Sequence, residues 1–225
     1  MMKKHVQIAL DGPSGAGKST LAKALARELG FIYIDTGAMY RTIALFMYRN
    51  AVDVENPEAV IARLDEVKVS IRYINGEQRV FLGEEDVSGA IRENIISLYA
   101  SKVSAIPAVR SSLLALQRTM AEENSVIMDG RDIGTVILPH ADVKFYLNAD
   151  PEIRARRRYL ELIQKGQQVN EADILQEIKE RDYRDEHREV APAVAAADTI
   201  RLNGNQELSD LINEALTVIR ERIGS

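Results

Sequence analysis

The residues best suited to chemistry form a glycine-rich segment near the start of the chain, GPSGAGKS, Gly12 to Ser19. Its spacing fits the phosphate-loop pattern G-x-x-x-x-G-K-[ST], and it lies between an apolar run and an amphipathic helical pattern. In that setting Lys18 can reach the β- and γ-phosphates of a nucleotide, and Ser19 can bind Mg²⁺. A chance glycine-rich turn is the alternative, and the flanking patterns argue against it. The residues expected to bind a nucleoside triphosphate are Gly12, Pro13, Ser14, Gly15, Ala16, Gly17, Lys18, Ser19 and Thr20.

A second motif, VIMDGRD, Val126 to Asp132, is an apolar run that ends in a carboxylate. Parallel strands present ligand-binding groups at their carboxyl ends, so this segment is expected beside the phosphate loop. Asp129 could hold Mg²⁺ through water, and Arg131 could bridge phosphates with two parallel hydrogen bonds. The alternative is a turn with an Arg–Asp surface pair.

The segment DTGAMYR, Asp35 to Arg41, follows the second predicted strand at the same end of the predicted sheet. Thr36 offers a hydroxyl group, and Arg41 lies one turn into the next helix. The alternative is simple helix capping. Asp35 and Asp129 are expected to be partners of a metal ion or of arginines rather than general bases.

Several arginines gather in a predicted helix, for which Asp150 is expected to be the N-cap and Pro151 the first residue. Three of them lie within about 100° of one another around the helix axis, whereas Arg156 points away. Like charges repel unless an anion lies between them, so one interpretation is a mobile segment that brings arginines onto transferring phosphates. The other is a solvated basic face. The three arginines are Arg154, Arg157 and Arg158.

The stretch RDYRDEHRE, residues 181–189, contains seven charged residues in nine. On a helix, Arg181, Asp185 and Arg188 share an arc of roughly 60°. Taken alone, the stretch is typical of a salt-bridged surface helix, and half of a binding site is the alternative. A second arc holds Asp182, Glu186 and Glu189.

The hydrophobic pattern along the chain predicts the elements that position these motifs. Short buried strands are expected at HVQIALDG, FIYID, SVIMDG, VKFYLNA and DTIRLNG, and helical periodicity lies between them. This alternation predicts an α/β, three-layer fold of the P-loop NTPase type with a five-stranded parallel sheet. Between about residues 63 and 90, two alternating runs flank Asn75-Gly76, which predicts a small antiparallel insertion.

Composition and charge exclude several classes of protein. The chain has 225 residues, of which 46% are hydrophobic and 28% are charged, as in a soluble globular protein. It has no cysteine, which excludes a disulfide framework and a thiolate metal site and permits a cytoplasmic location. No run approaches the ~18 apolar residues of a membrane span. The net charge of −5 with local arginine clusters favours a small anionic ligand over a nucleic acid.

The chain closely resembles bacterial cytidylate kinases over nearly its whole length. The resemblance rests on the segments GPSGAGKST, DTGAMYR and MDGRDIGT, the inserted hairpin and RDYRD. The resemblance implies transfer of the γ-phosphoryl group of ATP to CMP or dCMP, giving CDP or dCDP, with Mg²⁺ as cofactor. It implies a core over about residues 1–36, 111–150 and 190–225, an acceptor-binding region with the insertion over about 37–110, and a short helical lid with its following helix over about 151–189. We expect a cytoplasmic monomer whose partners are these small molecules, with no nucleic acid and no membrane.

The resemblance also assigns roles residue by residue. The catalytic residues that it implies are Lys18, Arg131, Arg157 and Arg158, and the metal site that it implies is Ser19 with Asp129. It places Thr36, Arg110 and Asp132 around the cytosine ring. The remaining CMP contacts are Arg41 and Arg131 at the phosphate, Ser101, Arg181 and Asp185 at the sugar, and Arg188 at the base and phosphate. On this assignment, Asp182, Glu186 and Glu189 form the solvated face of their helix.

A physical argument supports preference for cytosine. The N4 amino group of cytosine is a donor, whereas uracil has an acceptor there, so a carboxylate such as Asp132 would discriminate by about 1–3 kcal/mol per buried mismatch. Two rivals stay open. One is another P-loop kinase that acts on UMP, AMP or a hydroxyl acceptor, and the other is a nucleotide-dependent switch that regulates a partner.

Overall fold

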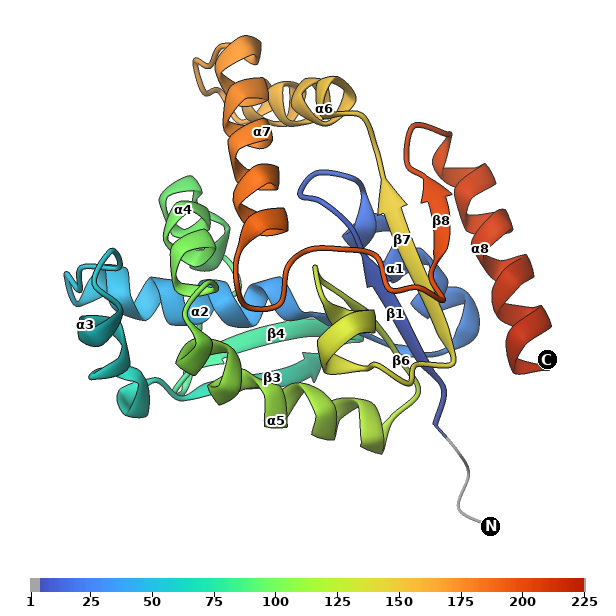
Figure 1. Ribbon diagram of the computed structural model, residues 1–225, viewed down its shortest axis with the longest axis horizontal. Coiled ribbons are helices and arrows are strands. Elements are labelled where there is room, and N and C mark those ends of the chain that lie inside the picture. The colour runs from blue at the N-terminus through green and yellow to red at the C-terminus, as the bar shows by residue number, and fades with distance from the viewer. Residues whose placement is uncertain (1–4, 225) are drawn as a thin grey trace. The chain divides into compact units, whose positions relative to one another are not determined.

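A computed structural model of the chain describes residues 5–224 (Figure 1). The chain divides into two compact units. The first comprises Met1–Tyr33 and Ala121–Ser225, and the second comprises Ile34–Met120. Among the described residues, no helix has both the length and the apolar character needed to cross a bilayer.

The parallel sheet has the strand order β2-β6-β1-β7-β8, which confirms the predicted five-stranded parallel sheet. Four of its strands lie in the first unit, and β2 begins there and ends in the second. The strands are β1 (Gln7–Asp11), β2 (Ile32–Asp35), β6 (Val126–Asp129), β7 (Val143–Asn148) and β8 (Ile200–Asn203). The central strand β1 pairs in parallel with β6 and with β7, and Leu10 lies opposite Asp129. The carboxyl ends of β1 and β6 therefore meet at one edge of the sheet, where both carry an aspartate.

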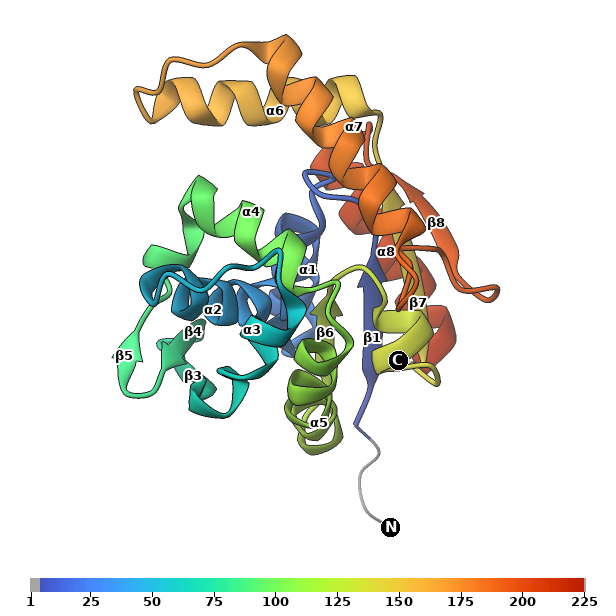
Figure 2. The ribbon, with the colours of Figure 1, turned by 60° about the vertical axis from the view of Figure 1, so that its left-hand side comes forward.

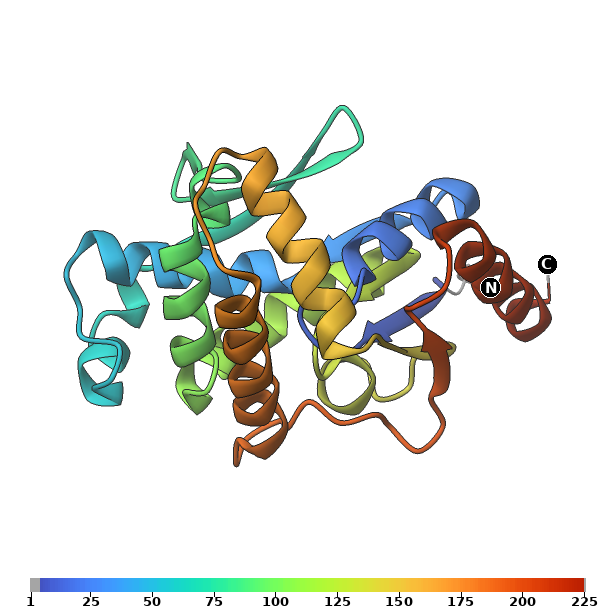
Figure 3. The ribbon, with the colours of Figure 1, turned by 90° about the horizontal axis from the view of Figure 1, so that it is seen from above.

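Helices α1 (Lys18–Leu29) and α8 (Leu208–Ile223) pack against this sheet and lie side by side (Figure 3). The apolar side chains that the sequence places on one side of α1, including Leu21 and Leu25, are fully buried. They join Ile8, Phe145 and Leu216 in one hydrophobic core. This burial fixes α1, and therefore the phosphate loop that precedes it, on the sheet.

Two further helices of the first unit, α6 (Pro151–Gln164) and α7 (Glu171–His187), follow β7 and pack against each other (Figure 2). They have their own small apolar cluster, formed by Ala155, Leu162 and Ile174. Proline occupies the first turn of α6, as predicted, although the side chain of Asp150 makes no capping hydrogen bond within the described part of the chain. Because this cluster is separate from the main core, the two helices form a distinct packing group.

The second unit contains the predicted insertion. Strands β3 (Val69–Ile74) and β4 (Glu77–Leu82) form an antiparallel hairpin around Asn75-Gly76, both of which have positive φ. A two-residue strand that the sequence analysis did not predict, β5 (Glu85–Asp86), extends this sheet. The helices of this unit are α2 (Thr36–Arg49), α3 (Pro57–Ile61), α4 (Asn94–Val103) and α5 (Pro107–Glu123), which continues into the first unit.

Candidate active site

The phosphate loop connects β1 to α1, and its backbone requires glycine. Gly12 has a φ of 142°, and a Cβ atom there would lie 2.0 Å from the carbonyl oxygen of Leu147. Gly17, which precedes α1, has a φ of 100°. Only glycine adopts these angles readily, so the loop can turn its N–H groups inward toward an anion at the N-terminus of α1.

Lys18 is buried at the start of α1, with 6% of its surface exposed. Its Nζ atom donates to the carbonyl oxygen of Pro13 at 2.7 Å, so the side chain folds back over the loop. Burial lowers the pKa of Lys18 well below its ordinary value, and the nearby charge of Arg131 lowers it further. An anion bound in the loop would offset both effects, because it would supply counter-charge to two neighbouring cations.

Ser19 and Asp129 come together as the sequence predicts. The Ser19 hydroxyl donates to the Asp129 carboxylate at 2.7 Å, and the Tyr33 hydroxyl donates to its other oxygen at 3.3 Å. Asp129 is 3% exposed. The described residues contain no cluster of three or more His, Cys, Asp or Glu side chains that could hold a metal. One carboxylate and one hydroxyl nevertheless fit Mg²⁺, which keeps several waters and commonly takes few protein ligands beside a nucleotide.

Asp11 is a buried carboxylate that the sequence analysis missed. It ends β1, and its two oxygens accept hydrogen bonds at 2.8 Å each from the backbone N–H groups of Ile133 and Gly134. These residues begin a π-helical turn, Ile133–Ile137, that directly follows Asp132. Burial raises the pKa of Asp11 to about 6. A carboxylate at the end of a predicted central strand, just before the first glycine of the loop, was the available signal.

An ionic cluster surrounds Asp185, which is buried on α7. Arg131 Nε lies 3.2 Å from its carboxylate, and Arg181 Nε lies 4.0 Å from it. Burial acts to raise the pKa of Asp185, but Arg131, Arg181 and Arg188 outweigh it and hold the pKa below the ordinary value. The cluster therefore keeps Asp185 ionised among guanidinium groups. Asp185 therefore does not lie on a solvated helix face, and the predicted binding role of RDYRDEHRE stays a prediction.

One detail of that stretch differs from the prediction. Helix α7 ends at His187, so Arg188 follows the helix and has an extended backbone. Its Nε donates to the Ala191 carbonyl at 2.6 Å, and its guanidinium lies 3.7 Å from Asp132, which is 3% exposed. Arg188 thus reaches Asp132 because the chain turns there, rather than because of helical spacing.

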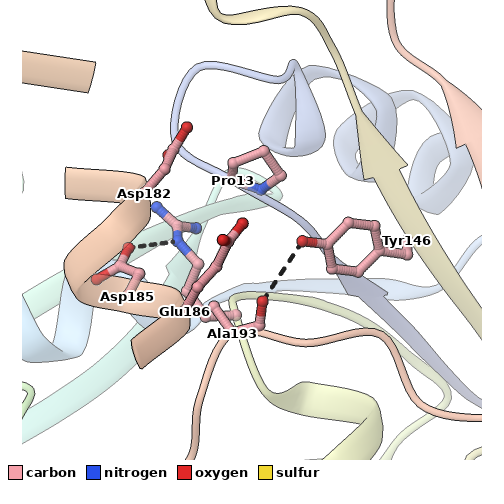
Figure 4. Close-up of a pocket in the computed structure, with 7 residues that line it drawn as sticks. Pro13, Tyr146, Asp182, Asp185, Glu186 and Ala193 are labelled. Carbon is pink, nitrogen blue, oxygen red and sulfur yellow. Dashed lines mark hydrogen bonds and ion pairs between the residues drawn. The ribbon is translucent and has the colours of Figure 1, made fainter. Parts of the chain in front are cut away.

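A pocket lies beside this cluster, between the phosphate loop and α7 (Figure 4). Arg131 Nε donates to the Asp185 carboxylate at 3.2 Å. The Tyr146 hydroxyl donates to the Ala193 carbonyl at 3.5 Å (Figure 4). The pocket is lined by Pro13, Arg131, Tyr146, Asp182, Asp185, Glu186 and Ala193. Its lining combines one arginine, which is paired with Asp185, with the carboxylates of Asp182, Asp185 and Glu186, so three acidic groups surround one cation beside the phosphate loop.

The expectation for Asp182 is wrong. It does not lie on a solvated face, because its carboxylate accepts from Arg154 at 2.5 Å and the Arg154 side chain is 3% exposed. Glu186 and Glu189 are exposed, as predicted.

Each of the three arginines on α6 that were predicted to share one face has a partner among the protein's own groups. Arg154 is buried against Asp182. Arg157 donates to the Gly204 carbonyl at 2.9 Å, and Arg158 pairs with Glu161 at 2.6 Å. Each of the three therefore has a partner within the chain.

The remaining predicted residues belong to the second unit. Asp35 caps α2 by accepting from the Ala38 N–H, and its carboxylate lies 3.0 Å from Arg92 and 3.8 Å from Arg41. Burial acts to raise the pKa of Asp35, but Arg41 and Arg92 hold it below the ordinary value. Asp35 is therefore both a helix cap and an arginine partner. Arg92 was not among the predicted site residues.

Three other predicted contacts lie on the helices of that unit. Thr36 is the first residue of α2 and is 3% exposed. Arg110 is buried on α5, donates to the Ser104 carbonyl at 3.1 Å, and has its guanidinium 5.4 Å from the centre of the Tyr40 ring. Ser101 lies on α4, and its carbonyl accepts from the Ser104 hydroxyl. Rigid helices thus hold these side chains.

These features define a class of protein. P-loop phosphotransferases combine a parallel sheet with a phosphate loop that carries a buried lysine, a serine–aspartate pair and nearby arginines. Their chemistry depends on positioning the substrates and on neutralising phosphate charge.

Comparison with known proteins then specifies the family. The chain belongs to the cytidylate kinase family, because the family model for cytidylate kinase matches residues 8–221. It is 44% identical over 223 residues to a cytidylate kinase of Caldicellulosiruptor saccharolyticus, covering 99% of both chains. It is 48% identical over 197 residues to a cytidylate kinase of Caldicellulosiruptor bescii, covering 88% of this chain and 87% of that one.

A solved structure shares the fold alone. An uncharacterized protein from Eubacterium ventriosum superimposes with a TM-score of 0.50 at 14% identity, covering 97% of this chain and 100% of that chain.

Proposed function

We propose that this chain transfers the γ-phosphoryl group of ATP to CMP or dCMP and releases ADP with CDP or dCDP. The observation that carries this proposal is the cluster of Arg131, Arg181 and Arg188 around Asp185, beside the buried Lys18 of the phosphate loop. Guanidinium groups bind phosphate through paired, charge-assisted hydrogen bonds. The cluster can therefore receive a phosphorylated acceptor next to the place where the loop receives ATP.

The chemical step requires little from the protein beyond alignment. An oxygen of the CMP phosphate attacks the γ-phosphorus, and the bond from that phosphorus to the β–γ bridging oxygen breaks. The attacking oxygen already carries charge, so no general base has to remove a proton from it. Lys18 and Arg131 would offset the charge on the transferring group, since both are cations that lie near each other at the loop.

The metal ion belongs to the same proposal. Ser19 and Asp129 would hold Mg²⁺, the first through its hydroxyl and the second through its carboxylate or an intervening water. When bound with ATP, the ion supplies charge neutralisation across the β- and γ-phosphates. The Tyr33 hydroxyl keeps the Asp129 carboxylate oriented through its second oxygen.

The lid arginines keep their predicted roles as proposals. Arg157 and Arg158 lie on α6, and their present partners are a backbone carbonyl and Glu161. Both partners are easily replaced by a phosphate, which is a stronger acceptor for guanidinium. The division of the chain into a core, an acceptor-binding region and a lid is part of the same proposal, as is a cytoplasmic monomer that acts only on small molecules.

Discrimination between bases is assigned to Asp132 together with Thr36 and Arg110. Asp132 is buried and has Arg188 as a neighbour 3.7 Å away, so its carboxylate is held in one place. The variant Asp132→Asn presents an amide that can donate to uracil. We expect its kcat/KM ratio of CMP to UMP to fall by about five- to 150-fold, corresponding to the 1–3 kcal/mol of one mismatched buried group.

The test of the function is an ADP-release assay with Mg·ATP and a panel of CMP, dCMP, UMP, AMP, GMP, TMP and shikimate. Turnover with CMP and dCMP, and little with the others, is the expected result. Turnover with UMP or AMP instead would retain the fold and the ATP site but refute the roles of Thr36, Arg110 and Asp132. The absence of turnover with every acceptor would refute the proposed kinase activity.

A further inference from the structure

One arginine of α6 is buried and has partners on three separate segments of the chain. Arg154 is 2% exposed, and all three of its nitrogen atoms donate hydrogen bonds. Its Nε donates to the Ala149 carbonyl at 2.8 Å, one terminal nitrogen donates to the Ser14 carbonyl at 3.0 Å, and the other donates to Asp182 at 2.5 Å. The side chain thus joins the end of β7, the phosphate loop and helix α7.

The contact with Ser14 constrains the phosphate loop. In a trans peptide the C=O and N–H bonds point in opposite directions, so a carbonyl held toward Arg154 turns the following N–H of Gly15 away from it. Gly15 has a φ of 76°, and a Cβ atom there would lie 3.4 Å from Arg154 Cβ. The loop therefore rests against the stem of Arg154, and its peptide at Ser14–Gly15 has one orientation.

Asp182 determines where the guanidinium lies. The Ala149 and Ser14 carbonyls carry no net charge, whereas Asp182 is a carboxylate and holds the buried Arg154 guanidinium in an ion pair. Within the described part of the chain, its other oxygen is buried without a hydrogen-bond partner. Asp182 also lies one turn before Asp185 on α7, so the pair links the phosphate loop to the helix that carries the acceptor cluster.

We propose that Arg154 and Asp182 are positioning residues for phosphoryl transfer. Asp182 holds the Arg154 guanidinium on the carbonyl oxygen of Ser14, and this contact fixes the phosphate-loop conformation that receives the triphosphate. The proposal rests on nucleotide binding at the loop and not on the identity of the acceptor. A probe that binds the loop alone therefore separates its failure from a failure of the proposed CMP kinase activity.

The experiment compares Asp182→Asn and Arg154→Lys with the control Glu180→Gln. The asparagine side chain would retain one neutral acceptor, and lysine retains the charge but cannot reach three acceptors at once. Glu180 lies exposed on the same helix and interacts with Gln176, so its variant removes the same charge without touching the loop. Calorimetry measures binding of inorganic tripolyphosphate, of ATP and of CMP, each with Mg²⁺ at a temperature where circular dichroism shows folded protein.

We expect Arg154→Lys and Asp182→Asn to weaken tripolyphosphate and ATP binding by about 13- to 160-fold, as for the loss of one charge-assisted hydrogen bond. CMP binding without ATP and the Glu180→Gln variant should match the unmodified protein. The double variant should be little worse than Arg154→Lys alone, because both changes act on one contact.

Two outcomes would overturn the proposal. If both variants lower the melting temperature but bind tripolyphosphate with unchanged affinity, the pair only stabilises the fold. If Asp182→Asn behaves as Glu180→Gln does in every measurement, Asp182 does not position Arg154. Should Arg154→Lys fail to fold, the comparison of Asp182→Asn with Glu180→Gln decides the question alone.

Discussion

Asp11 provides a quantitative prediction, because ionisation of a buried carboxylate opposes folding. Its pKa is raised to about 6 in the folded protein, chiefly by burial, although the two N–H groups lower it. The ordinary carboxyl value is 3.8. Between these values the folded protein retains a proton that the unfolded chain has already lost.

The sign and size of the effect follow from linkage. The contribution of Asp11 to stability is fully present below about pH 4 and is lost as the pH rises through 6. Each pH unit between the two pKa values contributes about 1.36 kcal/mol, so the loss amounts to about 3 kcal/mol. Asparagine has a similar shape and does not titrate. The difference in unfolding free energy, Asp11→Asn minus unmodified protein, should therefore rise by about 2.4 kcal/mol from pH 4 to pH 7.

Urea unfolding of the two proteins at half-unit pH intervals measures this difference. Titrating groups that do not interact with Asp11 contribute equally to both proteins and cancel. Asparagine offers only one acceptor to the N–H groups of Ile133 and Gly134, which shifts the whole difference curve but not its slope. A difference that stays constant across this pH range would refute the raised pKa. A kcat/KM for CMP that is also unchanged in the variant would show that Asp11 does not support the turn after Asp132.

Three further changes test the site. Gly12→Ala should abolish ATP binding measured by calorimetry, because its Cβ atom would lie 2.0 Å from the Leu147 carbonyl oxygen. Gly30→Ala is the control: Gly30 has a φ of 67° and open space around it, so the variant should bind ATP and lose only about 1 kcal/mol of stability in thermal unfolding. Asp185→Asn should raise the KM for CMP or lower kcat by at least about tenfold, because the buried guanidinium groups would lose their carboxylate partner. A fully active variant would restore the surface-helix interpretation. Ser19→Ala should raise the Mg²⁺ concentration needed for half-maximal activity. It should change the unfolding free energy by only about 1 kcal/mol, the contribution of the hydrogen bond from Ser19 to Asp129. An unchanged Mg²⁺ requirement would show that Ser19 is not part of the proposed metal site.

The sequence predicted the local elements well, because their signals are local. Apolar periodicity predicted the strands of the parallel sheet, and Gly30 ends α1 in the left-handed conformation that its position at the end of the pattern suggests. Asn75-Gly76 predicted the hairpin for the same reason, since both residues adopt positive φ. The two-residue strand β5 was missed because its pairing depends on a neighbouring strand and leaves no periodicity of its own.

Pairing between charged side chains was harder to predict. Helical spacing grouped Asp182 with Glu186 and Glu189, but α6 packs against α7 and brings Arg154 to Asp182. The same packing removes Arg154 from the set of arginines available to an anion. Asp11 was overlooked because its partners are backbone N–H groups 122 and 123 residues away.

What the sequence by itself determined is the chemistry that the chain can perform. The glycine spacing, Lys18, Ser19 and the carboxylate at the end of a buried strand predict phosphate and metal binding, because these residue types at this spacing suit that chemistry before any fold is known. What only the tertiary structure decided is which charges meet. Asp185 is held ionised by arginines and Asp182 holds Arg154 on the phosphate loop, since distances of about 3 Å between distant residues are set by helix packing and burial.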